Sequence, residues 1–355
     1  MNKAVRIVLT AWVVVTASIT LKSCSDVGCW IGRLPKGCEL CIEGLKSVIF
    51  ITGICSENCF YCPISHSRRG KDLTYVNDCL VRSTEDIICE LVASGSVGAG
   101  LTGGDPLVKL DKTISTIRTL KNFFGNKFHI HLYTTGLLIN EGTINELIKA
   151  GLDELRIHVV SDYSWQALKM VLKYPISVGI ENPVLPNAFD DLKKLILRAY
   201  DMGVEFINLN ELEFSDGNYL SLRLRGFKPK PGGIAAEGSE KLAVEILKWV
   251  KDSGLNINVH YCPAVFKDKY QYVRRLRRRA QNTRLVFEDI GEGLVRWASI
   301  ISCPEAVINR LIQSDQAFII NKEVITSIKI AQALGCKFQT IEALPLTPRR
   351  ILNRL

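Results

Sequence analysis

Hydrophobic residues along the chain follow two alternating periods. Short runs rich in valine, isoleucine and leucine predict buried strands, and longer stretches with apolar residues every three or four positions predict amphipathic helices. The predicted strands are Val48–Gly53, Ala99–Gly103, His129–Thr134, Glu154–Val160, Ser177–Asn182, Phe206–Glu213 and Asn256–Tyr261. The predicted helices between them are Thr84–Ser94, Lys112–Phe124, Thr143–Ala150, Trp165–Lys173, Asp190–Met202 and Glu240–Ser253.

Glycine follows most of these helices, where it supplies the left-handed cap that ends a helix. These glycines are Gly95, Gly125, Gly151, Gly203 and Gly254. Strands that alternate with helices predict a parallel sheet with right-handed crossovers. The pattern therefore indicates an α/β fold, either a full or partial barrel or an open doubly wound sheet. Ligands bind at the carboxyl ends of the strands in both.

The pattern changes after Pro263. The basic segment Lys267–Arg284 is predicted to be helical, and Leu285–Ile301 to form a hairpin. Helices are expected over Pro304–Ile312 and Glu323–Leu334, followed by a short strand and a basic tail. We therefore predict a cysteine-rich segment (1–44), a barrel (45–264) and a small α+β appendage (265–355). The loop 228–238, rich in proline and glycine, is expected to lie over one face of the barrel.

Composition places the chain among folded globular proteins, since 47% of its residues are hydrophobic and 23% are charged. It excludes disordered and fibrous proteins. The apolar stretch Ile7–Leu21 lies behind Lys3 and Arg6, but it is shorter than the roughly 20 residues that span a bilayer. No small-residue cleavage site follows it. We expect a buried N-terminal element, no stable membrane insertion and a cytoplasmic location.

The cysteines carry the strongest chemical signal. Close C-x-x-C spacing in a long chain favours metal binding in a reducing compartment over disulfides. Cys55, Cys59 and Cys62 form C-x-x-x-C-x-x-C directly after the first predicted strand. Three thiolates on a short loop can hold three irons of a cubane cluster, which leaves the fourth iron open. A zinc knuckle without its fourth ligand is the alternative, and the position after the strand favours the cluster.

This motif in this context resembles the radical S-adenosylmethionine (SAM) superfamily over about residues 45–263. The run GCELCIEGLKSVIFITGICSENCFYCPISHSRRGKD looks closest to mainly archaeal proteins related to pyruvate formate-lyase activating enzyme. The resemblance implies a partial (β/α)6-type barrel with a [4Fe–4S] cluster at Cys55, Cys59 and Cys62. It also implies reductive cleavage of SAM to a 5′-deoxyadenosyl radical, with a reductant such as ferredoxin or flavodoxin. It does not imply one substrate, because the scaffold hosts many reactions.

The turn Gly103-Gly104-Asp105 at the end of the second strand is similar to the superfamily's "GGE" turn, which receives the SAM amino group. Aspartate stands here in place of glutamate. Polar residues at later strand ends are weaker candidates for SAM contacts, with ordinary interior hydrogen bonding as the alternative for each. These candidates are Thr134, Arg156, His158, Glu181, Asn208 and Asn210. For His129 and His131 we expect roles as packing residues rather than ligands.

A second metal site, holding zinc or an auxiliary iron–sulfur cluster, is a further hypothesis. Its candidate ligands are Cys24, Cys29, Cys38, Cys41 and Cys262. The remaining cysteines lack such spacing and are predicted to be buried small hydrophobic residues. They are Cys79, Cys89, Cys303 and Cys336.

The net charge of +9 indicates an anionic partner. Five arginines of the basic helix offer phosphate contacts, and a solvated helix face is the alternative. They are Arg274, Arg275, Arg277, Arg278 and Arg279. The leading hypothesis is a radical SAM enzyme that acts on RNA or a nucleotide, or that activates a protein. A non-catalytic iron–sulfur or zinc protein that binds nucleic acid is the alternative.

Overall fold

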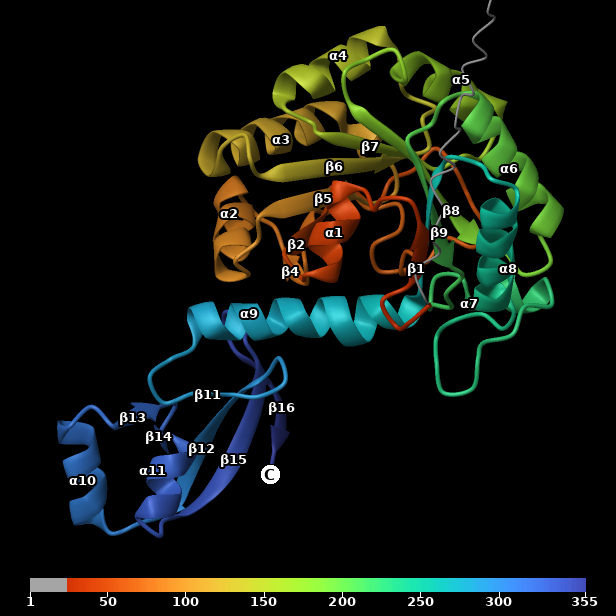
Figure 1. Cartoon of the computed structure of the whole chain (residues 1–355). Coiled ribbons are helices and arrows are strands. Elements are labelled where there is room, and N and C mark those ends of the chain that lie inside the picture. Colours follow the sequence, from red (N-terminus) through yellow and green to blue (C-terminus); the bar gives the residue numbers. More distant parts are fainter. Residues whose placement is uncertain (1–23) are drawn as a thin grey trace, which may run out of the picture.

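The computed structural model describes residues 24–355, and its larger part is a curved ten-stranded sheet with the order β1-β10-β9-β8-β7-β6-β5-β2-β3-β4 (Figure 1). The central strands pair in parallel. They are β2 (Lys46–Phe50), β5 (Gly98–Thr102), β6 (His129–Thr134), β7 (Glu154–Ile157), β8 (Ser177–Val184), β9 (Phe206–Glu211) and β10 (Asn258–Cys262). Each of these seven strands starts within two residues of the start that the sequence predicted. The predicted partial α/β barrel is confirmed.

Helices cover the convex face of this sheet (Figure 1). They are α2 (Thr84–Ala93), α3 (Leu110–Phe124), α4 (Glu141–Ala150), α5 (Asp162–Val171), α6 (Phe189–Asp201) and α8 (Ser239–Asp252). The predicted glycine caps all have positive φ angles, and Gly151 at φ 104° closes α4 in the left-handed region. The loop 228–238 folds back onto the end of β9, where Ala235 forms a bridge with Glu213.

The two edges of the sheet were not predicted. Strand β1 (Cys29–Ile31) pairs antiparallel with β10, and the short β3 (Tyr75–Val76) and β4 (Cys79–Leu80) extend the other edge beyond β2. Helix α1 (Lys36–Ile42) lies on the concave side, inside the barrel (Figure 1). These elements have only two to seven residues, too few to establish a hydrophobic period.

The two faces of each central strand differ in chemistry. Apolar side chains such as Ile49, Leu101 and Leu132 belong to the main hydrophobic cluster, which includes residues of the outer helices. The alternate positions point into the barrel, because side chains of a strand alternate between faces. Several of these positions carry buried polar side chains, among them Lys46, His131, Arg156, Asn208 and His260. The barrel interior is therefore a polar core, and each of its groups needs a partner.

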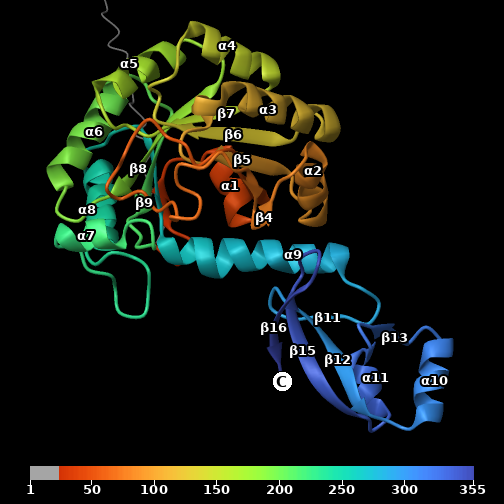
Figure 2. The same ribbon diagram turned by 180° about the vertical axis from the view of Figure 1, so that it is seen from behind.

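The residues after the helix that ends at Thr283 form a separate lobe (Figure 2). A π-helical turn, η2 (Phe266–Tyr272), leads into α9 (Val273–Thr283), and a six-stranded antiparallel sheet follows with its own hydrophobic cluster. Its strands are β11 (Asp289–Ile290), β12 (Val295–Ser302), β13 (Ala317–Ile320), β14 (Glu323–Thr326), β15 (Lys337–Leu344) and β16 (Arg350–Arg354). The helices α10 (Glu305–Gln313) and α11 (Ile328–Ala333) accompany it.

One prediction for this lobe was wrong. A helix was expected over Glu323–Leu334, but its first residues form β14 and only Ile328–Ala333 is helical. Valine, isoleucine and threonine in the first part favour a strand because their branched side chains fit a pleated surface. The conformation of the basic tail was not predicted; it forms β16, which pairs with β15.

The apolar stretch Ile7–Leu21 lies outside the described residues. Within residues 24–355, no helix combines the length and apolar character that crossing a bilayer requires.

Most arginines of the basic helix contact the barrel. Arg279 pairs with Glu90 of α2 at 2.6 Å, and both side chains are 5% exposed. Arg275 pairs with Asp78 at 3.3 Å, and Arg278 donates to the carbonyl oxygen of Glu43 over 3.2 Å. Arg274 also donates to a backbone carbonyl, that of Ile42, whereas Arg277 is exposed. One face of α9 therefore holds the lobe against the barrel, and RNA contact through these arginines stays a prediction.

Candidate functional site

The cysteine triplet lies on the loop that follows β2, at the carboxyl ends of the parallel strands. Cys55, Cys59 and Cys62 are free thiols, each partly buried, and all three line one cavity of about 580 Å³. The Cys62 amide donates to the Cys59 carbonyl oxygen over 3.0 Å, which folds the loop back on itself. Burial raises the pKa of the Cys55 and Cys59 thiols. Without a metal, these thiols are therefore neutral at pH 7.

The glycine turn after β5 packs directly against this loop. The Gly104 amide donates to the Thr52 carbonyl oxygen over 2.8 Å. A Cβ atom on Gly104 would lie 2.2 Å from the Ile54 carbonyl oxygen, and one on Gly103 would lie 2.3 Å from that of Thr52. Gly103 also has φ +149°, which other residues rarely adopt. The turn needs both glycines because the cysteine loop approaches so closely.

Asp105 holds the turn in place from behind the cavity. Its side chain is fully buried, and its carboxylate accepts hydrogen bonds from the Leu107 amide over 3.0 Å and from the Thr134 hydroxyl over 2.9 Å. The Thr135 amide and hydroxyl also donate to it, over 3.0 and 2.7 Å. With this many internal donors, Asp105 fixes the geometry between β5 and β6. A direct contact between Asp105 and SAM stays a prediction.

Tyr61 and His158 form one wall of the cavity. The Tyr61 hydroxyl lies 2.9 Å from Nε2 of His158, and Nδ1 of His158 lies 2.8 Å from the Glu181 carbonyl oxygen. A carbonyl oxygen only accepts, so Nδ1 carries the proton and Nε2 accepts from Tyr61. Burial lowers the pKa of His158, which keeps the ring neutral at pH 7. Both rings are therefore held in defined orientations beside Cys59 and Cys62.

Glu181 links the cavity to the polar interior of the barrel. Its carboxylate accepts from Asn208 over 3.0 Å and from Asn210 over 2.8 Å, and it pairs with Arg156 at 2.8 Å. Burial would raise the pKa of Glu181, but Arg156 and the two amides lower it, so the group stays ionised. Arg156 is 2% exposed and also pairs with Glu154.

The structure gathers most of the expected contact residues at one cavity. Those that line it are Cys55, Cys59, Cys62, Gly103, Gly104, Thr134, His158, Glu181 and Asn210. Asp105, Arg156 and Asn208 lie behind this lining, where they support it. Arg156 and Asn208 make hydrogen bonds inside the barrel, which is the alternative to SAM contact stated for these candidates.

Sequence reasoning missed several charged residues of the cavity. Lys267 and Glu213 pair at 3.3 Å and both line it, as does Arg69. Arg69 donates to the Cys62 carbonyl oxygen over 2.9 Å and so braces the cysteine loop. Lys267 had been assigned to the basic helix, and no sequence pattern connects it with Glu213. The signal available was that both residues follow the carboxyl end of a strand, Glu213 shortly after β9 and Lys267 in η2 after β10.

The candidate ligands of the second metal site differ in their bonding state. Cys24 and Cys29 form a disulfide, which corrects the expectation that they act as metal ligands. Cys38 and Cys41 are free and buried on α1, and Cys262 is free at the end of β10. Burial raises the pKa of Cys38 and of Cys262. A metal bound by these three thiols stays a prediction.

The isolated cysteines also differ from expectation. Cys303 and Cys336 form a disulfide between the region after β12 and the region before β15. Cys89 is exposed on α2, so its predicted burial was wrong. Cys79 is partly buried and lies 3.7 Å from the Glu90 carboxylate. Burial, followed by the Glu90 charge, raises the pKa of Cys79 to about 11.

Comparison with known proteins identifies the family. The radical SAM superfamily model matches residues 49–164. A protein of Methanocaldococcus jannaschii, whose name proposes a glycyl-radical enzyme activating function, is 40% identical over 272 residues, or 73% of this chain and 71% of that protein.

The solved structures to which this chain is similar have low sequence identity to it. SuiB of Streptococcus suis, bound to its precursor peptide SuiA, is 12% identical with a TM-score of 0.46, and the match covers 62% of this chain and 50% of SuiB. The radical SAM methyltransferase TsrM of Kitasatospora setae is 9% identical with a TM-score of 0.37, over 65% of this chain and 51% of TsrM. The chain thus spans about half the length of each. The 40% identity over most of both chains, together with the family match, shows that this protein belongs to the radical SAM superfamily as a relative of glycyl-radical enzyme activating enzymes.

Proposed function

We propose that the chain holds a [4Fe–4S] cluster through Cys55, Cys59 and Cys62, cleaves SAM in the adjoining cavity, and thereby activates a protein partner. The observation that carries this proposal is the meeting of three free thiols with the Gly103-Gly104 turn at one cavity. The donor set fits the cluster, because three thiolates leave one iron open for a further ligand. When bound, the reduced cluster supplies one electron to SAM, which divides into methionine and a 5′-deoxyadenosyl radical.

The residues around the cavity suit the separate parts of SAM. The backbone at Gly103 and Gly104 approaches the cysteine loop closely enough to bind the amino group beside the cluster. The ionised Glu181 carboxylate and the Asn210 amide offer partners for ribose hydroxyls. Thr134 and the neutral His158 complete the wall. Held by internal hydrogen bonds, these groups are oriented before the ligand arrives.

A protein is the substrate class that we favour. The support is the activating function proposed in the name of the relative from M. jannaschii. RNA has less support, because four of the five arginines on α9 bond to groups of the barrel. A ferredoxin or flavodoxin is the expected reductant.

Anaerobic reconstitution tests the proposal. With iron, sulfide, dithionite and SAM, the wild-type chain should release 5′-deoxyadenosine, measured by chromatography. The triple variant Cys55→Ala, Cys59→Ala, Cys62→Ala should release none and should lose the cluster absorbance. Cys89→Ala is the matched control, because Cys89 is an exposed cysteine on an outer helix. Failure of the reconstituted wild-type chain to cleave SAM would favour the non-catalytic binding protein.

The substrate class needs a second measurement. The reconstituted enzyme is incubated with extract of the source cell that has been separated into protein and RNA fractions, and hydrogen transfer is followed with SAM deuterium-labelled at C5′. Exchange of the label that depends on the protein fraction supports activation of a protein. Exchange that depends on the RNA fraction would replace that assignment and leave SAM cleavage intact.

A further inference from the structure

A short helix lies directly against the outside of the cysteine loop. It is α7 (Tyr219–Leu224), which follows β9 in the chain. The Asn218 side-chain amide, just before α7, donates to the Tyr61 carbonyl oxygen over 2.9 Å. The Ser221 hydroxyl donates to the carbonyl oxygen of Phe60. Both carbonyl groups belong to the backbone between two of the three proposed cluster ligands, so α7 is bonded to the loop that carries these ligands.

Packing fixes α7 in this position. Leu222 is 0% exposed and belongs to a small hydrophobic cluster against which Phe60 packs. The Arg225 guanidinium lies over the Phe60 ring, 4.4 Å from its centre. Gly217, which precedes α7, approaches the loop so closely that a Cβ atom there would overlap the Ile64 carbonyl oxygen. The outer face of α7 is therefore held at a fixed position relative to the cysteine loop.

The segment around α7 lies outside the SAM cavity. Residues 214–238, all of which the structure describes, contribute none of the side chains that line it, whereas Leu212 and Glu213 just before them do. A substrate has to enter the cavity, because the proposed radical forms there. A partner on α7 instead lies next to the cluster ligands and leaves the cavity free. An electron donor has this requirement, since it does not need to contact SAM.

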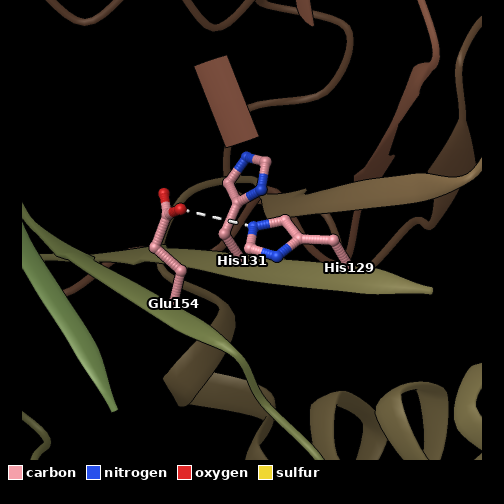
Figure 3. Close-up of side chains that lie close together, drawn as sticks. All are labelled: His129, His131 and Glu154. Carbon is pink, nitrogen blue, oxygen red and sulfur yellow. Dashed lines mark ion pairs between the residues drawn. The ribbon is translucent and has the colours of Figure 1, made fainter. Parts of the chain in front are cut away.

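The amino ends of the barrel strands are closed by buried side chains that pair with one another. Nε2 of His129 lies 3.3 Å from the Glu154 carboxylate (Figure 3), and Arg156 contacts the same carboxylate at 2.5 Å. These side chains fill the interior at that end of β6 and β7. A protein donor therefore approaches the cysteine loop from the carboxyl ends of the strands, where α7 lies.

The outer face of α7 presents two leucines to solvent. Leu220 and Leu224 are 70% and 77% exposed. Residues four positions apart lie side by side on a helix, so the two side chains form one apolar surface. Burial of a leucine side chain contributes about 1.5–3 kcal/mol. This pair is therefore a favourable contact for a partner.

Positive charge accompanies this apolar surface. Arg223 on α7 and Lys228 after it are both exposed, whereas the ion pairs of residues 214–238 belong to Lys230. The cysteine loop adds to the charge, because residues 56–71 and 214–238 together contain seven lysines and arginines but three acidic residues. Charge of this sign attracts an acidic protein and steers its approach.

We propose that Leu220, Arg223, Leu224 and Lys228, here termed the α7 patch, dock a small acidic one-electron carrier protein of the ferredoxin class. This inference rests on the proposed SAM chemistry, which uses one electron for each SAM that is cleaved. The docked ferredoxin gives up one electron, which the cluster accepts, and no bond forms or breaks in that step.

The size of the α7 patch suits such a carrier. Contacts between electron-transfer proteins are weak and small, below about 1,200 Å² of buried surface. The patch is centred on a helix of six residues, about 9 Å long. Ferredoxin is the smaller of the two expected carriers, and so it fits a contact surface of this extent.

The rate of cluster reduction tests the α7 patch separately from SAM cleavage. The reconstituted chain is mixed anaerobically, without SAM, with a catalytic amount of recombinant ferredoxin kept reduced by its reductase and NADPH. Loss of the cluster absorbance is followed over time. Leu220→Ser with Leu224→Ser should slow this reduction by about tenfold. Arg223→Glu with Lys228→Glu should slow it comparably and remove most of its dependence on salt.

Dithionite and matched variants are the controls. Dithionite should reduce every variant at the wild-type rate, because a small reductant needs no docking surface. Phe123→Ser removes an apolar side chain of α3 that is 57% exposed. Lys127→Glu with Lys173→Glu reverses two exposed charges that precede β6 and β8, near the amino ends of the strands. Ferredoxin should reduce both control variants at the wild-type rate.

A second readout needs no cluster. The variant Cys55→Ala, Cys59→Ala, Cys62→Ala should bind oxidised ferredoxin in a calorimetric titration, and the two leucine changes should weaken this binding by about tenfold. This binding tests the α7 patch even if the wild-type chain fails to cleave SAM with dithionite. Failure of the patch and failure of the proposed function are therefore distinguishable.

Several results would each overturn the proposal. One is reduction of both patch variants by ferredoxin at the wild-type rate. Another is slower reduction by dithionite as well, which would mean that the patch only stabilises the cysteine loop. Binding of flavodoxin but not of ferredoxin would replace the occupant. Normal cluster reduction with loss of the label exchange that depends on the protein fraction would mean that the patch binds the protein substrate.

Discussion

Tyr61 and His158 connect the cysteine loop to the end of β7, because the Tyr61 hydroxyl lies 2.9 Å from Nε2 of His158. The two residues are 97 positions apart in the chain. His158 is fixed in turn by the Glu181 carbonyl oxygen. The loop that carries the thiols is therefore oriented by a residue next to β7, which lies beyond the Gly103-Gly104 turn in the sheet.

Removal of this hydroxyl should impair SAM cleavage more than cluster assembly. Tyr61→Phe leaves Nε2 of His158 without its donor, at a loss of about 0.5–1.5 kcal/mol of stability. Iron content should stay at the wild-type level, while the rate of 5′-deoxyadenosine release falls several-fold. Tyr163→Phe is the matched control, since Tyr163 is 70% exposed. Equal rates for the two variants would contradict a positioning role for Tyr61.

Asp105 should be critical for stability of the barrel. Asp105→Ala removes the shared acceptor and leaves the donors of Thr134 and Thr135 unpaired in the interior. A buried donor left without a partner costs about 1–3 kcal/mol, so with several such donors the free energy of unfolding should fall by about 3 kcal/mol or more. Urea denaturation measures this. Asp111→Ala, at an exposed position on α3, should change it far less.

The ion pair between Arg279 and Glu90 should determine how firmly α9 attaches to the barrel. Loss of one partner of a buried pair leaves an uncompensated charge, so Arg279→Met should destabilise the chain by about 3–5 kcal/mol. Arg277→Met, two residues away but exposed, should have nearly no effect on thermal unfolding. Similar melting temperatures for both variants would show that this face of α9 does not stabilise the chain. Arg277→Met tests the prediction of RNA contact separately: if this exposed arginine contacts RNA, the variant should bind RNA more weakly in a filter-binding assay.

Stability should fall in mild acid because of His260. Its Nδ1 lies 3.2 Å from the Asn208 side-chain oxygen, and burial, followed by repulsion from Arg156, lowers its pKa to about 4. The unfolded chain binds this proton at a pKa near 6.5. The stability contribution is therefore fully present above pH 6.5 and decreases as the pH falls towards 4, by about 2 kcal/mol at pH 5.

Denaturation of the His260→Gln variant at pH 7 and pH 5 checks this dependence. The difference in unfolding free energy between the two pH values should shrink by about 2 kcal/mol in this variant. His66→Gln, at an exposed histidine, should keep the wild-type difference. If the stability of His260→Gln kept the wild-type dependence on pH, the folded chain would have to accommodate the protonated His260 ring without cost.

Much of the fold followed from the sequence, because its evidence is local. Alternation of apolar runs with amphipathic stretches located the central strands and outer helices, and glycines marked the helix ends. The cysteine triplet was equally readable, since Cys55, Cys59 and Cys62 share one loop and their spacing limits how they can be arranged. The short elements at the sheet edges and α1 were missed because a few residues cannot display a period.

Tertiary structure decided what each polar side chain does. Asp105 and Arg156 looked alike in sequence as charged residues at strand ends, yet both lie behind the cavity, whereas Glu181 faces it. The pairing of Lys267 with Glu213 and the approach of His131 to Glu154 depend on strand order and register. Spacing along the chain determines only which residues share a turn or a strand face. Which faces meet is determined by packing between segments distant in sequence, and that information lies in no single segment.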